Sequence, residues 1–345
     1  MPKTHEHWMQ RSFQLAAQGL GPAAPNPLVG CVIVHQDRII GEGYHTRAGQ
    51  AHAEVEALRS VTEPRLLAES TMYVNLEPCA HQGRTPACAP QVVQAGIPTV
   101  VIANRDPFDQ VDGKGIAILK AAGIEVVTGV LEKEGQWLNR RFFTQVTKGR
   151  PYVILKWAQS PDGFMAPEDD PTGTVHWITA PETQAITHRW RAEESAILVG
   201  AGTVLKDNPA LTVRAAAGEH PLRVVLDDQL QTPVDAAVYN STGNHLLVHA
   251  PGLSASDRNG WALERSKDFL SHLLTALHHK GVQSLIVEGG RNVLNTFIEA
   301  GLWDEARIWT GARALHGGTP APTLHSREIS QTVYGVDTLS VRLPL

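Results

Sequence analysis

The amino-acid sequence predicts an α/β fold divided into two units, and three observations support this prediction. Short apolar runs alternate with segments of helical periodicity, a pattern typical of a partly parallel sheet with helices on its faces. The 345 residues exceed the ~150 residues of an average domain. All three cysteines, Cys31, Cys79 and Cys88, lie before residue 89, which indicates that the two halves have different roles. The hydrophobic content of 42% and the charged content of 19% are those of a globular chain.

The first unit is expected to begin with a helix and then to alternate strands and helices. Apolar residues recur at helical spacing over residues 5–18, and Gly19 ends this helix. An apolar strand over 28–35 is followed by a hairpin partner over 39–43, across the turn Gln36-Asp37. Further strands are expected at 71–76, 99–103 and 126–128, and further helices at 52–59, 86–95, 115–122 and 132–147.

The segment Lys148-Gly149-Arg150-Pro151 breaks this pattern and predicts the domain boundary, with one domain over residues 1–147 and another over 151–345. In the second domain, strands are expected at 152–158, 196–200, 223–226, 245–249 and 284–288, and helices at 183–190, 266–280 and 292–300. Loops are expected at 161–173, 215–219 and 251–260, and the first of them is proline-rich and acidic. The tail 311–345 is the least informative part of the sequence.

Charge and hydropathy exclude several classes of protein. The net charge of −5 argues against strong electrostatic binding of nucleic acid. The longest apolar stretch, residues 28–34, is interrupted by Gly30 and is far shorter than the ~20 residues of a membrane span. The N-terminus shows no apolar signal core, and three cysteines are typical of a reducing compartment. We therefore expect a cytoplasmic protein that binds neither nucleic acid nor membranes.

Three short segments carry residues that bind metals: His52-Ala53-Glu54, Glu77-Pro78-Cys79 and the segment that ends at Cys88. One imidazole and two thiolates fill three positions of a tetrahedral zinc ion and leave the fourth open to water. Zinc lowers the pKa of bound water toward neutrality, and Glu54 would then act as general acid and base. The order of these residues matches the zinc-deaminase signature, except that the cysteines are nine positions apart instead of three.

Simpler interpretations stand beside these. By itself, the pattern His52-x-Glu54 also fits a helix face exposed to solvent. The set of His52, Cys79 and Cys88 also fits a structural zinc site, for which His81 is available as fourth ligand. Cys31 lies in an apolar strand and is expected to be a buried core residue. In the second unit, a strand runs through Gly289-Gly290 into a helix, which suits phosphate, although such a turn is more often plain turn chemistry.

A close resemblance to the zinc motif of the riboflavin-biosynthesis deaminases is carried by Pro78-Cys79-Ala80-His81-Gln82-Gly83-Arg84-Thr85-Pro86-Ala87-Cys88. Segments 26–32, 43–49 and 52–58 agree with the same family, in which a reductase follows the deaminase. The resemblance implies a cytidine-deaminase-like, three-layer domain that hydrolyses the 2-amino group of 2,5-diamino-6-(5-phosphoribosylamino)pyrimidin-4-one. It also implies that Asn26, His45 and Asp106 line the pyrimidine pocket.

The second half resembles the reductase of that family, beginning with Lys156-Trp157-Ala158-Gln159-Ser160-Pro161-Asp162-Gly163 and continuing over 177–179, 196–204 and 207–214. The resemblance implies a dihydrofolate-reductase-like α/β domain that uses NADPH to reduce the ribosyl group to ribityl. It implies NADPH contacts at Ala158, Trp177, Thr203, Asp207, Gly290, Arg291, Asn292, Val293, Leu294, Asn295 and Thr296. It implies substrate contacts at Lys156, Arg191, Leu211, Arg214 and Glu288.

Two positions depart from the family pattern, since Val175 and Asp228 stand where members often carry hydroxyl side chains, and the acidic loop 166–174 is longer than usual. A deaminase with a degenerate reductase half is therefore an alternative. A deaminase directed at nucleic-acid bases is a second alternative, which the acidic balance disfavours, and a non-enzymatic zinc protein is a third. A small pyrimidine ribotide is the expected partner, and self-association into a homo-oligomer stays open.

Overall fold

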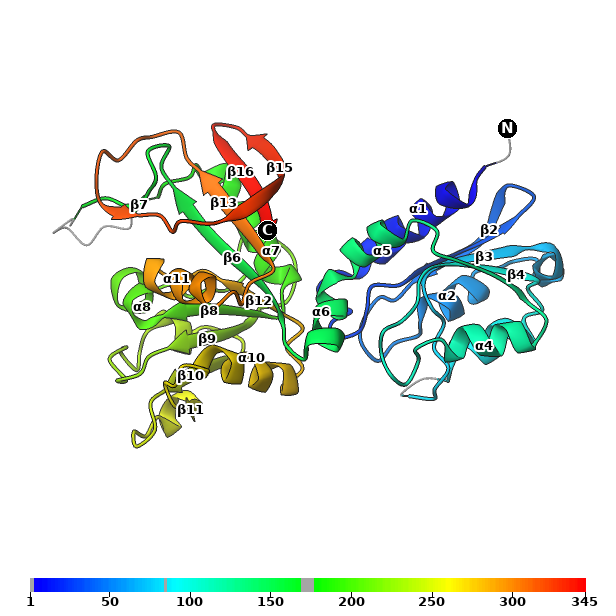
Figure 1. Ribbon diagram of the computed structural model, residues 1–345, viewed down its shortest axis with the longest axis horizontal. Helices are drawn as coiled ribbons and strands as arrows, with labels where there is room; N and C mark the ends of the chain where they lie inside the picture. Colours follow the sequence, from blue (N-terminus) through cyan, green and yellow to red (C-terminus); the bar gives the residue numbers. More distant parts are fainter. Residues whose placement is uncertain (1–2, 84–85, 169–176) are drawn as a thin grey trace. The chain divides into compact units, whose positions relative to one another are not determined.

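The computed structural model describes residues 3–83, 86–168 and 177–345 (Figure 1). The chain divides into two compact units, Met1–Gly149 and Arg150–Leu345, and each unit has its own main sheet. Every helix within the described residues is too short or too polar to cross a lipid bilayer.

A five-stranded sheet forms the middle layer of the first unit, in the order β2-β1-β3-β4-β5. Its first three strands are antiparallel, whereas β3, β4 and β5 run parallel. The strands are β1 (Gly30–His35), β2 (Arg38–Tyr44), β3 (Thr71–Leu76), β4 (Thr99–Asn104) and β5 (Glu125–Thr128). The helices are α1 (His5–Ala16), α2 (Ala53–Arg59), α3 (Cys88–Gln94), α4 (Lys114–Ala121), α5 (Glu132–Leu138) and α6 (Arg140–Lys148), with short 3-10 turns η1 (Ala17–Gly19) and η2 (Pro64–Glu69).

Helices cover both faces of this sheet, which confirms the expected three-layer architecture (Figure 1). On one face, Ile33 of β1 packs in a cluster with Ala57 of α2 and Val92 of α3. On the other face, Val32 of β1 packs in a cluster with Trp8 of α1. Because β1 is buried on both faces, its sequence is a continuous apolar run instead of an alternating one.

The helix expected over 132–147 is interrupted at Asn139, which separates α5 from α6. Asn139 is buried, and its carboxamide binds both backbone groups of Leu28: Oδ1 accepts the N–H at 2.8 Å, and Nδ2 donates to the carbonyl at 2.9 Å. These bonds satisfy the buried backbone just before β1. Helical periodicity contains no signal for such a distant partner, which is why a single helix was the prediction.

Nine strands form one mixed sheet in the second unit, in the order β11-β10-β9-β8-β12-β6-β13-β16-β15. Neighbours from β11 to β13 are parallel, and β16 and β15 are antiparallel additions at one end. The strands are β6 (Tyr152–Gln159), β8 (Ala196–Gly200), β9 (Leu222–Leu226), β10 (His245–His249), β11 (Gly260–Ala262), β12 (Ser284–Val287), β13 (Glu305–Thr310), β15 (Ser326–Tyr334) and β16 (Asp337–Pro344).

Helices again lie on both faces of the second sheet. Leu273 and Phe297 of α10 and α11 pack on one face, and Trp190 and Val204 of α7 and α8 pack on the other. The helices are α7 (Gln184–Glu193), α8 (Ala201–Asp207), α9 (Ala237–Asn240), α10 (Phe269–His279) and α11 (Arg291–Glu299), with short 3-10 turns η3 (Pro181–Thr183) and η4 (Ser256–Arg258). The predicted mixed α/β class is thereby confirmed for both units.

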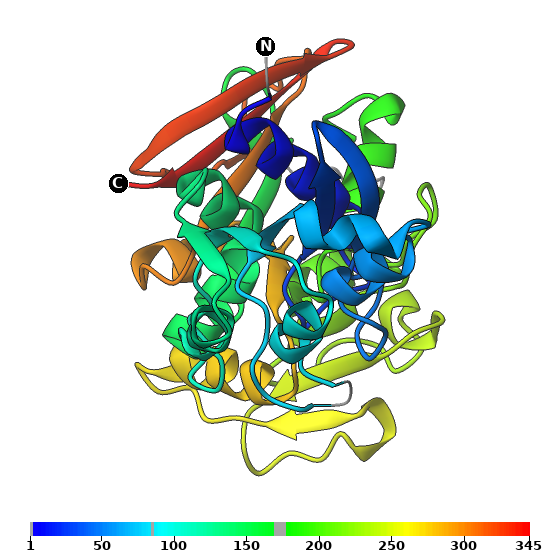
Figure 2. The same cartoon turned by 90° about the vertical axis from the view of Figure 1, so that its right-hand side faces the viewer.

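Several segments form strands that the sequence does not predict. The tail ends in the hairpin β15–β16, drawn in red in Figures 1 and 2. Nearly all of β15 is exposed, so it lacks the alternation that marks a half-buried strand. Strand β7 (Phe164–Ala166) lies within the expected loop 161–173 and pairs with β14 (Thr319–Pro320), and β11 begins at the end of the expected loop 251–260. Each of these strands is held by a partner that its own local pattern does not show: β15 by the adjacent β16, β11 by β10, and β7 by the distant β14.

Candidate active sites

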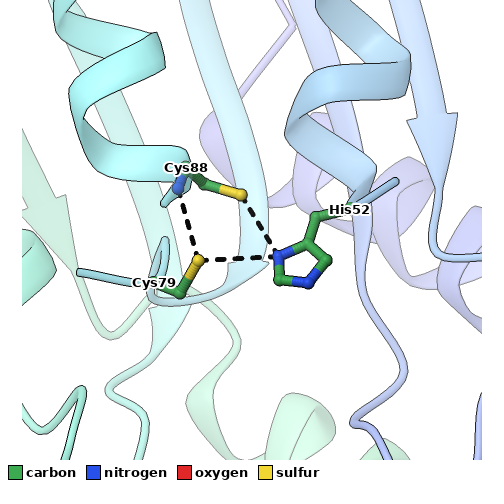
Figure 3. Close-up of side chains that lie close together, drawn as sticks. All are labelled: His52, Cys79 and Cys88. Carbon is green, nitrogen blue, oxygen red and sulfur yellow. Dashed lines mark hydrogen bonds between the residues drawn. The ribbon is translucent and has the colours of Figure 1, made fainter. Parts of the chain in front are cut away.

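Three element ends bring the candidate metal ligands of the first unit together (Figure 3). His52 is the N-cap of α2, Cys79 follows β3, and Cys88 is the first residue of α3. His52 Nδ1 lies 3.5 Å from Cys79 Sγ and 3.2 Å from Cys88 Sγ. The backbone N–H of Cys88 donates to Cys79 Sγ at 3.3 Å. The three candidate ligand atoms lie within 4.8 Å of one another, so they can share one ion.

These separations fit a tetrahedral zinc ion. With Zn–S distances of about 2.3 Å and Zn–N distances near 2.0 Å, two ligand atoms lie roughly 3.5–4 Å apart. Among the described residues, His81 is outside the ligand group, and its ring packs edge-on against Phe108. A site with three protein ligands and a fourth open position is typical of catalytic zinc and not of structural zinc.

The two thiols are electrostatically different. A hydrogen bond from Cys88 lowers the pKa of Cys79 to about 4, with His52 and the Cys88 backbone N–H adding to the effect against the opposing influence of burial. The same contact, reinforced by burial, raises the pKa of Cys88. The protein alone therefore favours one thiolate beside His52, which is the charge state that a metal ligand requires.

Glu54 lies in the first turn of α2 and is only 3% exposed. Burial and the negative charge of Cys79 raise the pKa of Glu54 to about 7, although His52 partly opposes them. A carboxyl group with a pKa near neutrality can take up a proton and return it within one reaction cycle.

The third cysteine, Cys31, is fully buried in the core, as expected.

Asn26 and His45 lie next to the metal ligands. His45 donates from Nδ1 to the Ala51 carbonyl at 3.0 Å, so its Nε2 accepts from Asn26 Nδ2, also at 3.0 Å. The rings of His45 and His52 stand edge to face with centroids 5.4 Å apart. Burial lowers the pKa of His45, which favours the neutral ring that this hydrogen-bond chain needs. The structure therefore brings both residues to the rim of the metal site.

Glu77, a residue whose role the sequence does not reveal, holds Asp106 near the segment that carries Cys79. The buried Glu77 carboxylate accepts three backbone N–H groups: those of Asp106 at 3.3 Å, Gly113 at 3.0 Å and Ile116 at 3.1 Å. It therefore ties the loop before α4 to the segment that carries Cys79. Burial, followed by the charges of Glu77 and Cys79, raises the pKa of Asp106 to about 6. An acidic residue directly after a buried strand is the only sequence signal for this anchor.

In the second unit, an ionic cluster gathers Lys156 of β6, Arg191 of α7 and Glu288 at the end of β12. Arg191 donates to Glu288 twice, from Nε to Oε1 at 3.2 Å and from Nη2 to Oε2 at 2.8 Å. Lys156 Nζ lies 3.8 Å from Oε2. Burial acts to raise the pKa of Glu288, but the two cations outweigh it and lower that pKa to about 2. Burial lowers the pKa of Lys156, which makes it a better proton donor.

A glycine-rich turn follows β12 beside this cluster. A Cβ atom on Gly289 would lie 2.7 Å from Val293 Cβ, so only glycine permits this close approach of strand and helix. Gly290 is the N-cap of α11, and its N–H donates to Thr203 Oγ1 of α8 at 3.1 Å. The turn thus places two of the sequence-predicted cofactor positions in contact, at a helix N-terminus of the kind that binds phosphate.

The other sequence-predicted residues of this unit differ in accessibility. Leu294 is fully buried in the core, and Trp177 is 68% exposed. Val175 lies outside the described residues, and Asp228 pairs with Arg265. Ala158 lies in β6, Asp207 is the last residue of α8, and Arg291, Asn292, Val293, Asn295 and Thr296 lie on α11.

Leu211 and Arg214 follow α8 on a segment that His188 connects to α7. The backbone N–H of Arg214 donates to His188 Nδ1 at 3.1 Å. The charges of Arg191, Arg214 and Glu288 all act on His188, so the two arginines lie in one region of the unit. Sequence reasoning did not single out His188, because a histidine inside a helix carries no distinctive pattern.

Comparison with known proteins assigns both halves of the chain. A family model described as the cytidine and deoxycytidylate deaminase zinc-binding region matches residues 2–104, and one described as the RibD C-terminal domain matches residues 151–343. With the geometry above, these matches define a bifunctional enzyme, in which a zinc-binding deaminase precedes a reductase.

Relatives that match the whole chain narrow this class to one family. Riboflavin biosynthesis proteins RibD of Aquifex aeolicus and Bacillus amyloliquefaciens are 38% and 40% identical to it, over 95% and 97% of this chain and 92% and 91% of their own lengths. The RibD structure from Acinetobacter baumannii and the deaminase/reductase structure from Thermotoga maritima each superpose with a TM-score of 0.89, at 34% identity over 99% of both chains. The chain belongs to the RibD family.

The function of the chain follows from this membership. It is an enzyme of riboflavin biosynthesis with a hydrolytic deaminase activity and a reductase activity, and its deaminase domain is a zinc-binding domain. The alternatives of a nucleic-acid deaminase and of a degenerate reductase half are not favoured, because the matches extend over both domains.

Proposed function

We propose that the first domain, residues 1–147, deaminates 2,5-diamino-6-(5-phosphoribosylamino)pyrimidin-4-one and that the second, residues 151–345, reduces the product with NADPH. The observation that carries this proposal is the presence of two separate polar clusters in one chain. His52, Cys79 and Cys88 gather in the first unit, and the Lys156–Arg191–Glu288 cluster lies in the second. We place the enzyme in the cytoplasm, where its thiol ligands stay reduced.

In the deaminase, His52, Cys79 and Cys88 would hold one zinc ion. When bound, zinc supplies a water molecule acidified toward neutral pH. Glu54 takes a proton from the attacking water as the C2–oxygen bond forms and gives it to ring N3, and it then carries the second proton of that oxygen to the amine as the C2–nitrogen bond breaks. Asn26, His45 and Asp106 orient the pyrimidine for this attack. The products are ammonia and the 2-oxo pyrimidine.

In the reductase, the N-terminus of α11 and Thr203 would hold the phosphates of NADPH, and this cofactor would supply a hydride. With the cofactor bound, reduction would form a new bond between hydrogen and C1′ of the ribosyl group and break the bond between C1′ and the ring oxygen. Lys156 Nζ gives a proton to that oxygen, while Glu288 holds the ammonium group in place. Arg191 and Arg214 bind the 5-phosphate of the substrate through charge-assisted hydrogen bonds.

Two variants test these assignments in one assay, in which the products are weighed by mass spectrometry. The wild-type enzyme with zinc, the diaminopyrimidinone ribotide and NADPH should exchange an amino group for oxygen and add two hydrogens. Glu54→Gln should retain zinc and stop the exchange, yet still reduce the 2-oxo substrate when this is supplied. Lys156→Met should give the exchange without added hydrogen. Unchanged NADPH oxidation by Lys156→Met, or normal deamination by Glu54→Gln, would refute the assigned role.

A further inference from the structure

We propose that His188 and His220 are positioning residues, which hold the backbone of residues 211–214 so that Arg214 meets the substrate. This inference rests on the proposed function, in which Arg214 binds the substrate of the reductase. The two imidazoles bind adjacent residues in the same manner: His188 Nδ1 accepts the N–H of Arg214, and His220 Nδ1 accepts the N–H of Val213, both at 3.1 Å. Each Nδ1 must therefore be unprotonated, with the ring proton on Nε2.

The segment needs external support because no regular element supplies it. It lies between the end of α8 at Asp207 and the start of β9 at Leu222. Asn208 and Leu211 have φ values of +40° and +55°, in the left-handed region that a leucine rarely occupies. Such a conformation persists only where surrounding contacts over-determine it. The two histidines provide contacts of this kind, since each satisfies a backbone donor that would otherwise lack a partner in the segment.

Two buried side chains, His188 of α7 and Arg223 of β9, contact this part of the backbone from regular elements. His188 is buried in α7, three residues before Arg191. The same helix therefore carries one of the proposed substrate arginines, Arg191, and the histidine that holds the backbone of the other, Arg214. At the near end of the segment, the fully buried Arg223 donates from Nη1 to the Ala210 carbonyl at 3.4 Å. Side-chain contacts therefore hold this backbone at residues 210, 213 and 214, and the two histidines make the contacts nearest to the Arg214 side chain.

The Arg214 guanidinium is suited to an incoming anion. It is exposed, its Nη1 donates to Thr212 Oγ1 at 3.1 Å, and no carboxylate pairs with it among the described residues. Loss of a histidine would move the backbone that carries this side chain but would leave Lys156 and Glu288 in place. The expected consequence is a lower affinity for the substrate with an unchanged rate of hydride transfer.

Matched substitutions separate this role from simple packing. Asparagine places an acceptor oxygen where histidine has Nδ1, whereas glutamine places its amide one bond further out. For His188→Gln and His188→Ala we expect the KM for the 2-oxo ribotide to rise about tenfold, with kcat within about twofold, because the partly buried N–H of Arg214 loses its partner. For His188→Asn we expect a KM within about threefold of wild type. The same order is expected at His220, and no change is expected for His279→Ala at the exposed end of α10.

Two further measurements make each outcome decisive. The NADPH dissociation constant should be unchanged in every variant, which shows that the reductase unit is folded. Amide exchange at Val213 and Arg214 should accelerate in the glutamine and alanine variants and return to normal in the asparagine variants. Unchanged KM and exchange in His188→Ala and His220→Ala, or asparagine variants no better than glutamine variants, would overturn the proposal. A wild-type enzyme that fails to oxidise NADPH with this substrate would instead overturn the proposed function, and the exchange data would still test the contacts.

Discussion

The carboxylate of Glu288 is expected to contribute substantially to the stability of the reductase unit. Its side chain is 8% exposed, and Arg191 and Lys156, at 12% and 16%, are similarly shielded. Glu288→Gln keeps the size of the side chain but leaves two cations facing each other without their shared anion. Breaking a buried ion pair in this way costs ~3–5 kcal/mol.

The pKa of Glu288 gives a second estimate of the stability that its charge contributes. That pKa falls from an ordinary value of 4.5 to about 2 in the folded protein. Since each pKa unit corresponds to ~1.4 kcal/mol, the charge contributes about 3 kcal/mol at neutral pH. Because the folded pKa is depressed, this stabilisation is present above pH 4.5 and is lost as the pH falls toward 2. The difference between wild type and Glu288→Gln should therefore be constant from pH 5 to 8 and shrink below pH 4.5.

Hydrogen exchange of peptides from β6 and β12 measures this free energy for the reductase unit alone, whatever the stability of the deaminase unit. Glu299→Gln, in the exposed last residue of α11, is the matched control and should have no effect. If Glu288→Gln lowered the unfolding free energy of the unit by less than about 1 kcal/mol at pH 7, this reasoning would be refuted, because the buried ion pair would then contribute far less stability than expected. A difference between wild type and variant that persists undiminished at pH 3 would refute the assignment to the charge of Glu288.

Three other outcomes are expected. Glu77→Gln places an amide donor among three backbone donors, so it should raise the deaminase KM about tenfold without loss of zinc, measured by steady-state kinetics and metal analysis. Glu54→Gln should lower the deaminase kcat at least ~10²-fold while zinc content stays at wild type; full activity would exclude Glu54 as the proton carrier. Removal of zinc with a chelator should abolish ammonia release and leave NADPH oxidation intact, and added zinc should restore the former; parallel loss of both activities would contradict separate sites.

Local sequence was sufficient for the central elements of the fold. The strands at 71–76, 196–200 and 245–249 have the predicted bounds, because strands buried on both faces are largely apolar runs between turn residues. Asn139 and β15 show where such reasoning ends. The break at Asn139 depends on the distant Leu28, and β15, which is almost entirely exposed and has no alternating pattern, depends on its pairing with the adjacent β16.

The candidate sites divide in the same way. The clustering of His52, Cys79 and Cys88, the candidate metal ligands, was predictable because few residue types bind zinc and their order along the chain is restrictive. Glu77, His188 and His220 were not predictable, since each binds backbone N–H groups, and a backbone donor has no residue-type signature in the sequence. Their contribution is visible only when the fold brings them to the loops that they hold.

One labelled reaction tests the central claim that a single chain performs deamination and then reduction. The zinc-loaded wild-type enzyme is incubated with the diaminopyrimidinone ribotide in ¹⁸O-water, with NADPH that carries deuterium at the transferred position. We predict a product that contains one ¹⁸O at C2 and one deuterium at C1′ of a ribityl chain. A product with ¹⁸O and no deuterium would contradict the reductase assignment, and recovery of unlabelled substrate with zinc verified as bound would contradict the account as a whole.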